Sequence, residues 1–272
     1  MMMDRKVWVR LADTKVYTPE FDDEVTYIVP INSAEDFTAP HFYASFPEVI
    51  RIKDYEGLKE RVQNISSDER ADGIMVHSVE GLELLKEAGF IKKIVAGPGL
   101  YAFNKASETF IKRDTEKYVI PLELSYHEMK ELDLRGAILN IFGRTPLMIT
   151  ANCVRKTEKC CIKGKDQASP LSFGTITDRK RTDFPVLFQC DYCYNVIYNS
   201  VPTSLHEFVR DNIVQAKDGH KERLGDLMLS FSVESSREVN EITGYFIGIL
   251  KGEDPICPIK EHTKAYFNHG VD

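Results

Sequence analysis

The sequence contains no run that approaches the roughly 20 consecutive apolar residues of a membrane-spanning helix. The chain begins MMMDRK and continues directly into VWV, without the apolar core of a secretory signal peptide. These absences predict a cytoplasmic protein with no membrane partner. Because thiols stay reduced in the cytoplasm, the six cysteines are expected to be ligands, nucleophiles or core residues rather than disulfides.

Several catalytic signatures are also missing. None of the seven histidines belongs to an H-E-x-x-H motif, which excludes the usual zinc-protease helix, and there is no G-x-S-x-G nucleophile turn. Gly97-Pro-Gly99 lacks the G-x-G-x-x-G spacing of a dinucleotide cradle and indicates a turn. The net charge of −7 argues against a protein that coats nucleic acid with its whole surface, although it allows a local basic patch.

What the sequence does contain is a series of short runs rich in Val, Ile, Leu and Tyr. They show little alternation of polar and apolar residues, as expected for strands that are buried on both faces. The eight expected strands are Lys6–Leu11, Val25–Ile31, His41–Val49, Gly73–Val79, Lys93–Ala96, Tyr118–Leu124, Ala137–Phe142 and Asp226–Val233.

Helix signals lie between many of these runs. Capping boxes, in which a serine is followed three residues later by a glutamate, predict helix starts at residues 125–128, 204–207 and 235–238. Strands that alternate with helices predict an α/β fold of the (β/α)8 TIM-barrel type. The first two crossovers, residues 12–24 and 32–40, are too short for full helices, so the first quarter should be irregular. An open doubly wound sheet is the competing arrangement, because the pattern does not show closure.

The alternation breaks after the seventh strand. Residues 144–224 contain one helix signal and no strand that we could assign. Loops longer than about 15 residues are uncommon in compact domains and are usually functional or disordered. We therefore expect a single barrel-like domain over residues 1–272, with an ordered insertion at 144–224. The insertion should lie on the C-terminal face of the sheet, where the active sites of barrel enzymes lie.

Five of the six cysteines fall in this insertion. Cys190 and Cys193 form a C-x-x-C pair, whose spacing lets two thiolates converge on one metal ion or cluster. Cys153 and either Cys160 or Cys161 can supply the other two ligands. Four thiolates suit zinc or an iron–sulfur cluster. Two alternatives stay open, namely inert cysteines in the core and a catalytic or redox thiol.

The insertion is also locally basic. Residues 144–181 contain nine Lys or Arg and three Asp or Glu, which gives a local charge of nine minus three, or +6. Tyrosines follow closely, and cations with nearby rings are what a single-stranded RNA surface needs. We predict that Lys156, Lys163 and Arg179–Arg181 lie on one face; the alternative is a solvated surface loop.

Residues at the expected C-terminal ends of strands would face one common mouth in a barrel. Arg10, His77, Asn104, Glu123 and Arg144 hold such positions. Glu123 ends an otherwise apolar run, where a carboxylate costs free energy unless it has a partner or a chemical task. We therefore take Glu123 and Arg144 as candidate catalytic residues. The alternative is a structural ion pair between the two.

Three stretches together resemble the C-terminal part of long members of the peptidase U32 family, the collagenase-like peptidases. The first includes Pro121-Leu-Glu-Leu-Ser-Tyr-His-Glu128, Gly143-Arg-Thr-Pro-Leu-Met148 and Asn152-Cys-Val-Arg-Lys-Thr157. The second runs from Thr177-Asp-Arg-Lys180 through Phe184-Pro-Val186 to Cys190-Asp-Tyr-Cys-Tyr-Asn-Val-Ile-Tyr-Asn-Ser-Val-Pro202. The third is Phe267-Asn-His-Gly-Val-Asp272.

The resemblance implies a barrel-type domain and three classes of function. Several members of the family are iron–sulfur proteins that support hydroxylation of RNA bases or of a quinone precursor, and this favours a 4Fe-4S cluster over zinc. The family's name implies the alternative of a peptidase. The missing early helices favour a third class, a non-catalytic subunit that pairs with a full-length U32 relative. RNA and a second U32-type protein are the partners that these hypotheses imply.

Overall fold

The computed structural model describes residues 5–157, 171–214 and 225–271, and eight parallel strands form its central sheet. Strand β7 pairs with β6 on one side and with β13 on the other, which closes the sheet into a barrel. The predicted (β/α)8 architecture is therefore confirmed, and the open sheet is excluded. Around the barrel the strands follow the order β1 (Val7–Leu11), β2 (Val25–Pro30), β3 (Phe42–Ser45), β4 (Ala71–Val76), β5 (Lys93–Ala96), β6 (Lys117–Val119), β7 (Ala137–Gly143) and β13 (Asp226–Phe231).

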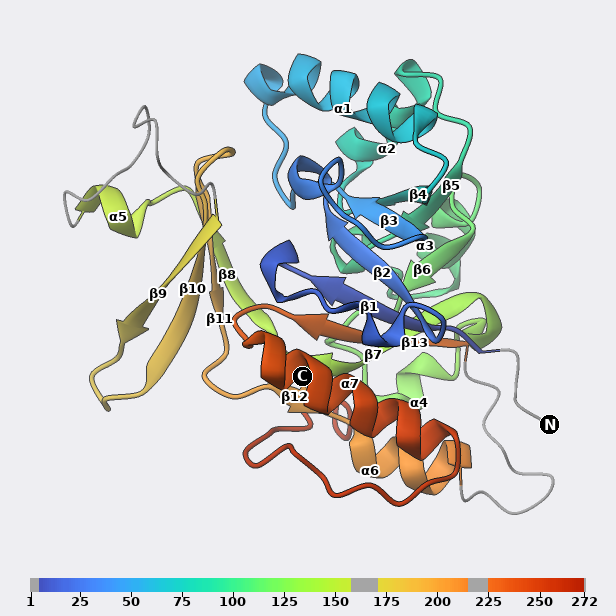
Figure 1. Cartoon of the computed structure of the whole chain (residues 1–272), viewed down its shortest axis with the longest axis vertical. Helices are drawn as coiled ribbons and strands as arrows, with labels where there is room; N and C mark the ends of the chain where they lie inside the picture. Colours follow the sequence, from blue (N-terminus) through green and yellow to red (C-terminus); the bar gives the residue numbers. More distant parts are fainter. Residues whose placement is uncertain (1–4, 158–170, 215–224, 272) are drawn as a thin grey trace.

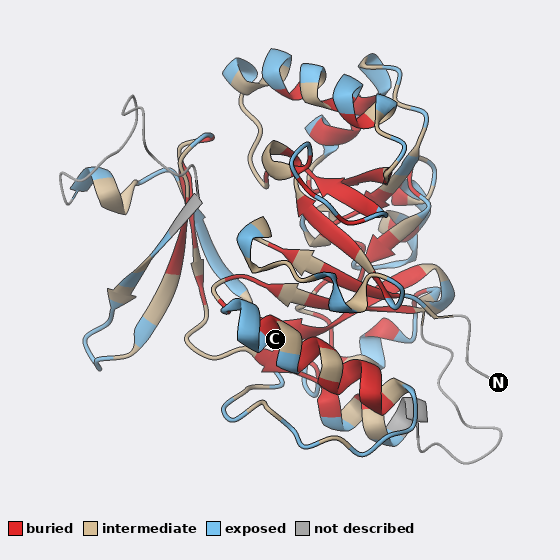
Figure 2. Ribbon diagram, viewed as in Figure 1, coloured by how far each residue is buried: buried red, intermediate tan, exposed pale blue. Residues whose placement is uncertain are grey.

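The barrel has an interior core of its own, to which each of the eight strands contributes one side chain. Trp8 and Tyr43 meet edge to face there, with ring centroids 4.8 Å apart. A larger cluster fills the space between the strands and the outer helices, so both faces of the strands are buried (Figure 2). The interior residues are Trp8, Ile28, Tyr43, Met75, Val95, Val119, Ile138 and Met228.

Helices cover the outside of the barrel after the third strand (Figure 1). They are α1 (Tyr55–Ser67), α2 (Val79–Glu87), α3 (Lys105–Ile111), α4 (Tyr126–Met129) and α7 (Ser236–Leu250). The first two crossovers contain only 3-10 turns, which are η1 (Thr14–Val16), η2 (Pro19–Phe21) and η3 (Ile31–Ser33), so the irregular first quarter is confirmed. Other 3-10 turns are η4 (Ile52–Asp54), η5 (Pro98–Leu100) and η6 (Leu134–Gly136). In the described part of the chain, no helix is both long and apolar enough to cross a membrane.

Two of the three predicted capping boxes are present. Those at residues 125–128 and 235–238 open α4 and α7 as expected. The third is wrong, because Ser204 belongs to the short strand β12 (Thr203–Ser204), which pairs with β7. Its hydroxyl lies 2.9 Å from Nδ1 of His206, and helix α6 (His206–Phe208) begins without a side-chain cap. Strand pairing has overridden a local helix signal.

The insertion contains a second sheet, where we had predicted no strand. Its strands are antiparallel in the order β8–β11–β10–β9. Their bounds are β8 (Pro146–Thr150), β9 (Leu171–Thr177), β10 (Asp183–Gln189) and β11 (Tyr194–Tyr198), and the insertion also holds α5 (Val154–Thr157), β12, α6 and the π-helical turn η7 (Val209–Val214). Serine, glycine and threonine interrupt the apolar pattern of β9, proline lies within β10 and an asparagine within β11, which explains why the sequence did not reveal these strands.

The insertion sheet stands beside the barrel and packs against its C-terminal end (Figure 1). Leu187, Tyr194, Val196 and Tyr198 are buried and belong to the same hydrophobic cluster as the outer face of the barrel strands. Burial of this apolar area fixes one face of the sheet at the mouth of the barrel.

Candidate functional site

A cavity of about 80 Å³ lies where the insertion sheet meets the C-terminal ends of the barrel strands. In barrels of this type the active site lies at that end, because the loops after the strands converge there. The polar side chains that line the cavity include Arg10, Ser45, Glu48, Asn140, Arg144, Gln189, Ser230 and Ser232. Tyr192 and Tyr198 add aromatic surface from the insertion.

One ion pair at this mouth joins the barrel to the insertion. Arg10 Nη2 lies 2.7 Å from Oε1 of Glu48, and the hydroxyl of Tyr194 donates to Oε2 of Glu48 at 2.6 Å. Burial alone would raise the pKa of Glu48, but the charge of Arg10 and the bond from Tyr194 outweigh it and lower the pKa to about 2. Glu48 is therefore ionised at neutral pH and holds β11 over the cavity.

A second ion pair closes the other side of the mouth. Arg144 Nε donates to Oε1 of Glu234 at 3.2 Å, and its Nη1 donates to the backbone carbonyls of Asn199 and Ser200. The predicted pair between Glu123 and Arg144 is wrong, because the carboxylate beside Arg144 is that of Glu234. Glu123 is half-buried in the turn after β6. A catalytic role for Glu123 or Arg144 stays a prediction.

The other strand-end residues divide into two groups. Arg10 lines the cavity, and His77 lies 3.0 Å from Ser45, which also lines it. Asn104 does not face the mouth, because its side chain caps α3 by accepting from the backbone amides of residues 106 and 107. Sequence reasoning missed Glu48, although it lies near the end of the expected strand His41–Val49, and a carboxylate at the end of an apolar run is the signal that led to Glu123.

The C-x-x-C segment forms the turn between β10 and β11, and four hydrogen bonds hold it at the mouth. Arg51 donates to the backbone carbonyls of Tyr192 and Cys193. Asn32 donates to Oδ2 of Asp191 at 2.6 Å and accepts from the hydroxyl of Tyr192. The loops after β2 and β3 therefore fix the cysteine turn beside the cavity.

Cys153 lies at the same end of the insertion sheet. It follows β8, whose last residue Thr150 pairs with Asn195 at the start of β11. Arg155 Nη1 donates to the sulfur of Cys190 at 3.7 Å. Burial raises the pKa of the Cys190 thiol, the charge of Arg155 opposes this rise, and the neighbouring Cys153 adds to it.

The metal ligands that we predicted are thus only partly accounted for. Cys153, Cys190 and Cys193 lie at the same end of the sheet, while Cys160 and Cys161 lie outside the described residues. Within the described ranges, no group of three or more His, Cys, Asp or Glu side chains is arranged to hold a metal ion. Cys257 lies outside the insertion; it is exposed, and its thiol contacts the carbonyl of Ile259.

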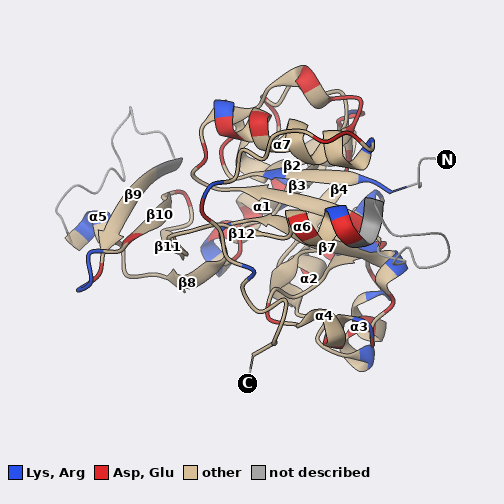
Figure 3. Cartoon of the chain, turned by 90° about the horizontal axis from the view of Figure 1, so that it is seen from below, with Lys and Arg blue, Asp and Glu red and all other residues tan. Residues whose placement is uncertain are grey.

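The described residues of the predicted basic face lie at two separate places on the insertion sheet. Arg179–Arg181 lie in the turn between β9 and β10, next to the Thr177–Asp183 end of the sheet, where Figure 3 shows the basic residues of this turn. Lys156 lies on α5, beyond Thr150 at the opposite end. Lys156 and the Arg179–Arg181 turn thus lie at opposite ends of the sheet, Lys163 lies outside the described residues, and the single basic face stays a prediction.

Comparisons with known proteins give one structural neighbour. No family model matches the sequence, and a search of curated proteins found no match. Among solved structures, the chain is similar to that of the U32 peptidase Mk0906, with 10% sequence identity and a TM-score of 0.44. The match covers 85% of this chain and 94% of the other. This neighbour carries the name of the family that the sequence motifs resemble.

Proposed function

We propose that this chain is an iron–sulfur protein of the U32 type, with a cluster held beside the mouth of the barrel. The ligands would be Cys153, Cys190, Cys193 and one of Cys160 or Cys161. The observation that supports the proposal is that cysteines from two separate segments meet at the end of the sheet whose turn borders the cavity. If these cysteines were isolated core residues, nothing would require the two segments to place them at the same end of the sheet.

The residues fit such a centre by their chemistry. Iron–sulfur clusters are held by cysteine thiolates, and several thiolates in one place repel each other unless a cation offsets their charge. Arg155 supplies that cation, with its guanidinium over the ring of Phe188 and against the sulfur of Cys190. A bound cluster would supply one-electron transfer.

The rest of the proposed function concerns the cavity. A substrate there would contact the guanidinium of Arg10 and the amide of Asn140, and it would also touch Tyr192 of the cysteine turn. The reaction class that we propose is support of hydroxylation of an RNA base or a quinone precursor. Zinc is the alternative occupant, because the same thiolates bind it.

Purification without oxygen, followed by iron and sulfide analysis and by absorbance spectroscopy, tests the centre. We expect iron and sulfide in the wild-type protein and their loss in Cys190→Ser and Cys193→Ser. Cys257→Ser is the matched control, because Cys257 is exposed and outside the proposed ligand set, so it should keep full iron content. Protein without iron after anaerobic reconstitution, a zinc-only site, or full iron content in Cys193→Ser would each refute the proposal.

A further inference from the structure

A serine and a histidine meet in the wall of the cavity, away from the cysteines. Ser45 ends β3 and His77 directly follows β4, so neighbouring parallel strands place them side by side. Ser45 Oγ lies 3.0 Å from Nε2 of His77. Ser45 is 6% exposed and His77 is 4% exposed, and Ser45 lines the cavity. A hydroxyl in hydrogen-bond contact with an imidazole is the arrangement that activates a serine nucleophile.

His77 has little room to move, because Gly97 lies against its ring and Gly99 lies against its backbone. A Cβ atom at Gly97 would stand 2.3 Å from Nδ1 of His77, and one at Gly99 would stand 2.5 Å from its carbonyl oxygen. The amide of Gly97 also donates to the carbonyl of Val76 at 2.7 Å, which holds the loop after β5 against β4. A larger residue at Gly97 would displace the ring, and one at Gly99 would displace the backbone of His77, so both glycines suit this placement of His77.

The surroundings keep His77 neutral at physiological pH. Burial and, to a smaller extent, the charge of Arg10 lower the pKa of His77 to about 4, although Glu48 acts in the opposite direction. A neutral imidazole has one nitrogen that can accept a proton from a hydroxyl group. In the tautomer that carries its proton on Nδ1, the lone pair at Nε2 is available to Ser45 throughout the neutral range.

We propose that Ser45 is a nucleophile, that His77 is its general base, and that the cavity takes an uncharged ester or amide. Each arginine of the cavity is paired with a glutamate, Arg10 with Glu48 and Arg144 with Glu234. An uncharged group can enter without leaving a charge unpaired. The guanidinium of Arg10 also lines the cavity and offers N–H donors to a carbonyl oxygen on which negative charge develops.

The proposed reaction needs no co-reactant other than water. Ser45 Oγ bonds to the carbonyl carbon while its proton passes to Nε2 of His77. When the tetrahedral adduct collapses, the bond to the leaving alcohol or amine breaks, and the leaving group takes the proton from His77. Water then repeats the sequence on the acyl-serine and releases the acid. No cysteine takes part. The proposal of this activity can therefore be tested independently of the proposed iron–sulfur centre.

A fluorophosphonate probe, which bonds to activated serines, tests the proposal on the full-length protein by peptide mapping in a mass spectrometer. We expect one adduct, on Ser45. Ser230 and Ser232 line the same cavity, and Ser230 Oγ faces the side-chain amide of Asn140 while Ser232 Oγ faces Glu234, so neither should react. His77→Gln keeps a hydrogen-bonding group but no base, and should slow labelling at least about 100-fold.

The pH profile separates a catalytic pair from a structural one. Labelling should be constant in the neutral range and should fall as pH drops toward the low pKa of His77, because the protonated ring accepts no proton. Circular dichroism and the melting temperature show whether each variant is folded. Folded wild-type protein without an adduct on Ser45, equal labelling of Ser230, or an unchanged rate in folded His77→Gln would overturn the proposal.

Discussion

The two ends of the barrel use buried charge for different purposes. At the base, where the strands begin, Asp226 accepts from Nε1 of Trp8 and from Nζ of Lys117, both at 2.9 Å, and from the backbone amide of Lys6 at 3.1 Å. All these partners lie in or next to strands of the barrel. At the mouth, Glu48 instead accepts from Tyr194 of the insertion and faces a cavity. Charge at the base holds the barrel closed, whereas charge at the mouth holds the insertion over the site.

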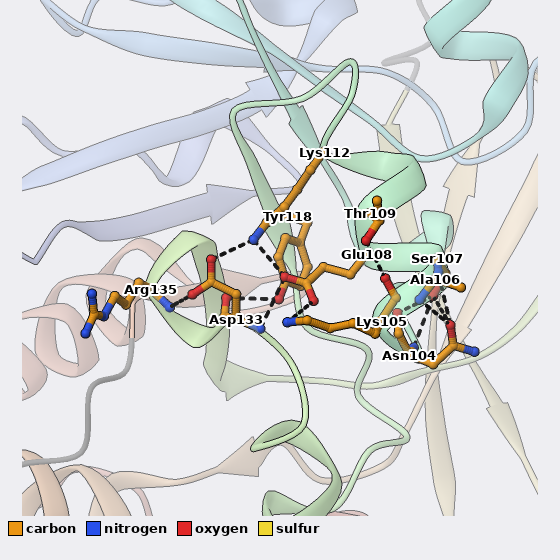
Figure 4. Close-up of polar contacts among 10 residues, drawn as sticks. All are labelled: Asn104, Lys105, Ala106, Ser107, Glu108, Thr109, Lys112, Tyr118, Asp133 and Arg135. Atoms are coloured by element: carbon orange, nitrogen blue, oxygen red, sulfur yellow. Dashed lines mark hydrogen bonds and ion pairs between the residues drawn. The ribbon is translucent and has the colours of Figure 1, made fainter.

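A second group of ion pairs at the base of the barrel also lies away from the mouth cavity. Lys112, at the end of α3, lies 2.7 Å from Oε1 of Glu108 and 2.8 Å from Oδ2 of Asp133, and Figure 4 shows it between these two carboxylates. Tyr118 of β6 donates to the carbonyl of Asp133 at 3.1 Å. The network ties a helix to the connection between β6 and β7 and borders no part of the mouth cavity.

Asp226→Ala should have the largest effect on stability. The change leaves Lys117 and the indole N–H of Trp8 without their acceptor, and breaking a buried ion pair costs about 3 kcal/mol. Urea unfolding, followed by the fluorescence of Trp8, measures this loss, because Trp8 is the single tryptophan of the chain. Asp226→Asn, which keeps an acceptor for Trp8, should lose less. If neither variant is destabilised, the base does not depend on this charge.

Glu48→Gln should release the insertion and leave the barrel intact. The folded-state pKa of Glu48 is about 2, below its ordinary value, so its stabilisation is complete above the ordinary value. It is lost as pH falls from the ordinary value toward 2, and its size is on the order of 2 kcal/mol. The protection of amides in β10 and β11 against hydrogen exchange, corrected for the intrinsic rate, should therefore fall on acidification in the wild type, and it should already be low at neutral pH in Glu48→Gln.

Trp8 fluorescence provides the control for this variant, because Trp8 lies in the interior of the barrel. It should change little in Glu48→Gln under conditions in which exchange in the insertion has already risen. Simultaneous loss of both signals would mean that mouth and base are one cooperative unit, and the contrast between the two ends would not hold.

The sequence predicted the strands of the barrel but not the insertion sheet at its mouth. All eight barrel strands were found, because burial on both faces leaves continuous apolar runs such as Ala137–Phe142. The insertion sheet was missed, since polar residues such as Asn195 interrupt its strands. The partners of Glu48 and Arg144 were missed for another reason: Tyr194 lies 146 residues from Glu48, and Glu234 lies 90 residues from Arg144. No local pattern encodes contacts at such separations.

Lys112→Met should destabilise the protein by about 1 kcal/mol, less than the change at Asp226. Burial raises the pKa of Glu108, but the hydrogen bonds from Lys112 and Lys105 outweigh burial and lower the pKa overall. The carboxylate therefore stabilises the fold at pH values above its ordinary pKa. This contribution is lost as the pH falls. Lys105 still pairs with Glu108 at 3.0 Å in the variant, which limits the loss. Urea midpoints at neutral and acidic pH should show a smaller difference between variant and wild type in acid.

Glu116→Gln should have the smallest effect, although Glu116 also lies at the base, just before β6. Its carboxylate is 3.6 Å from the ammonium of Lys93, and the two side chains are 45% and 51% exposed. Exposed pairs contribute less than about 0.5 kcal/mol because water and salt screen them and two flexible side chains lose freedom. The urea midpoint should shift little at low ionic strength and should match the wild type in about 0.5 M salt. A loss comparable to that of Asp226→Ala would show that position at the base, rather than burial, sets the strength of these charges.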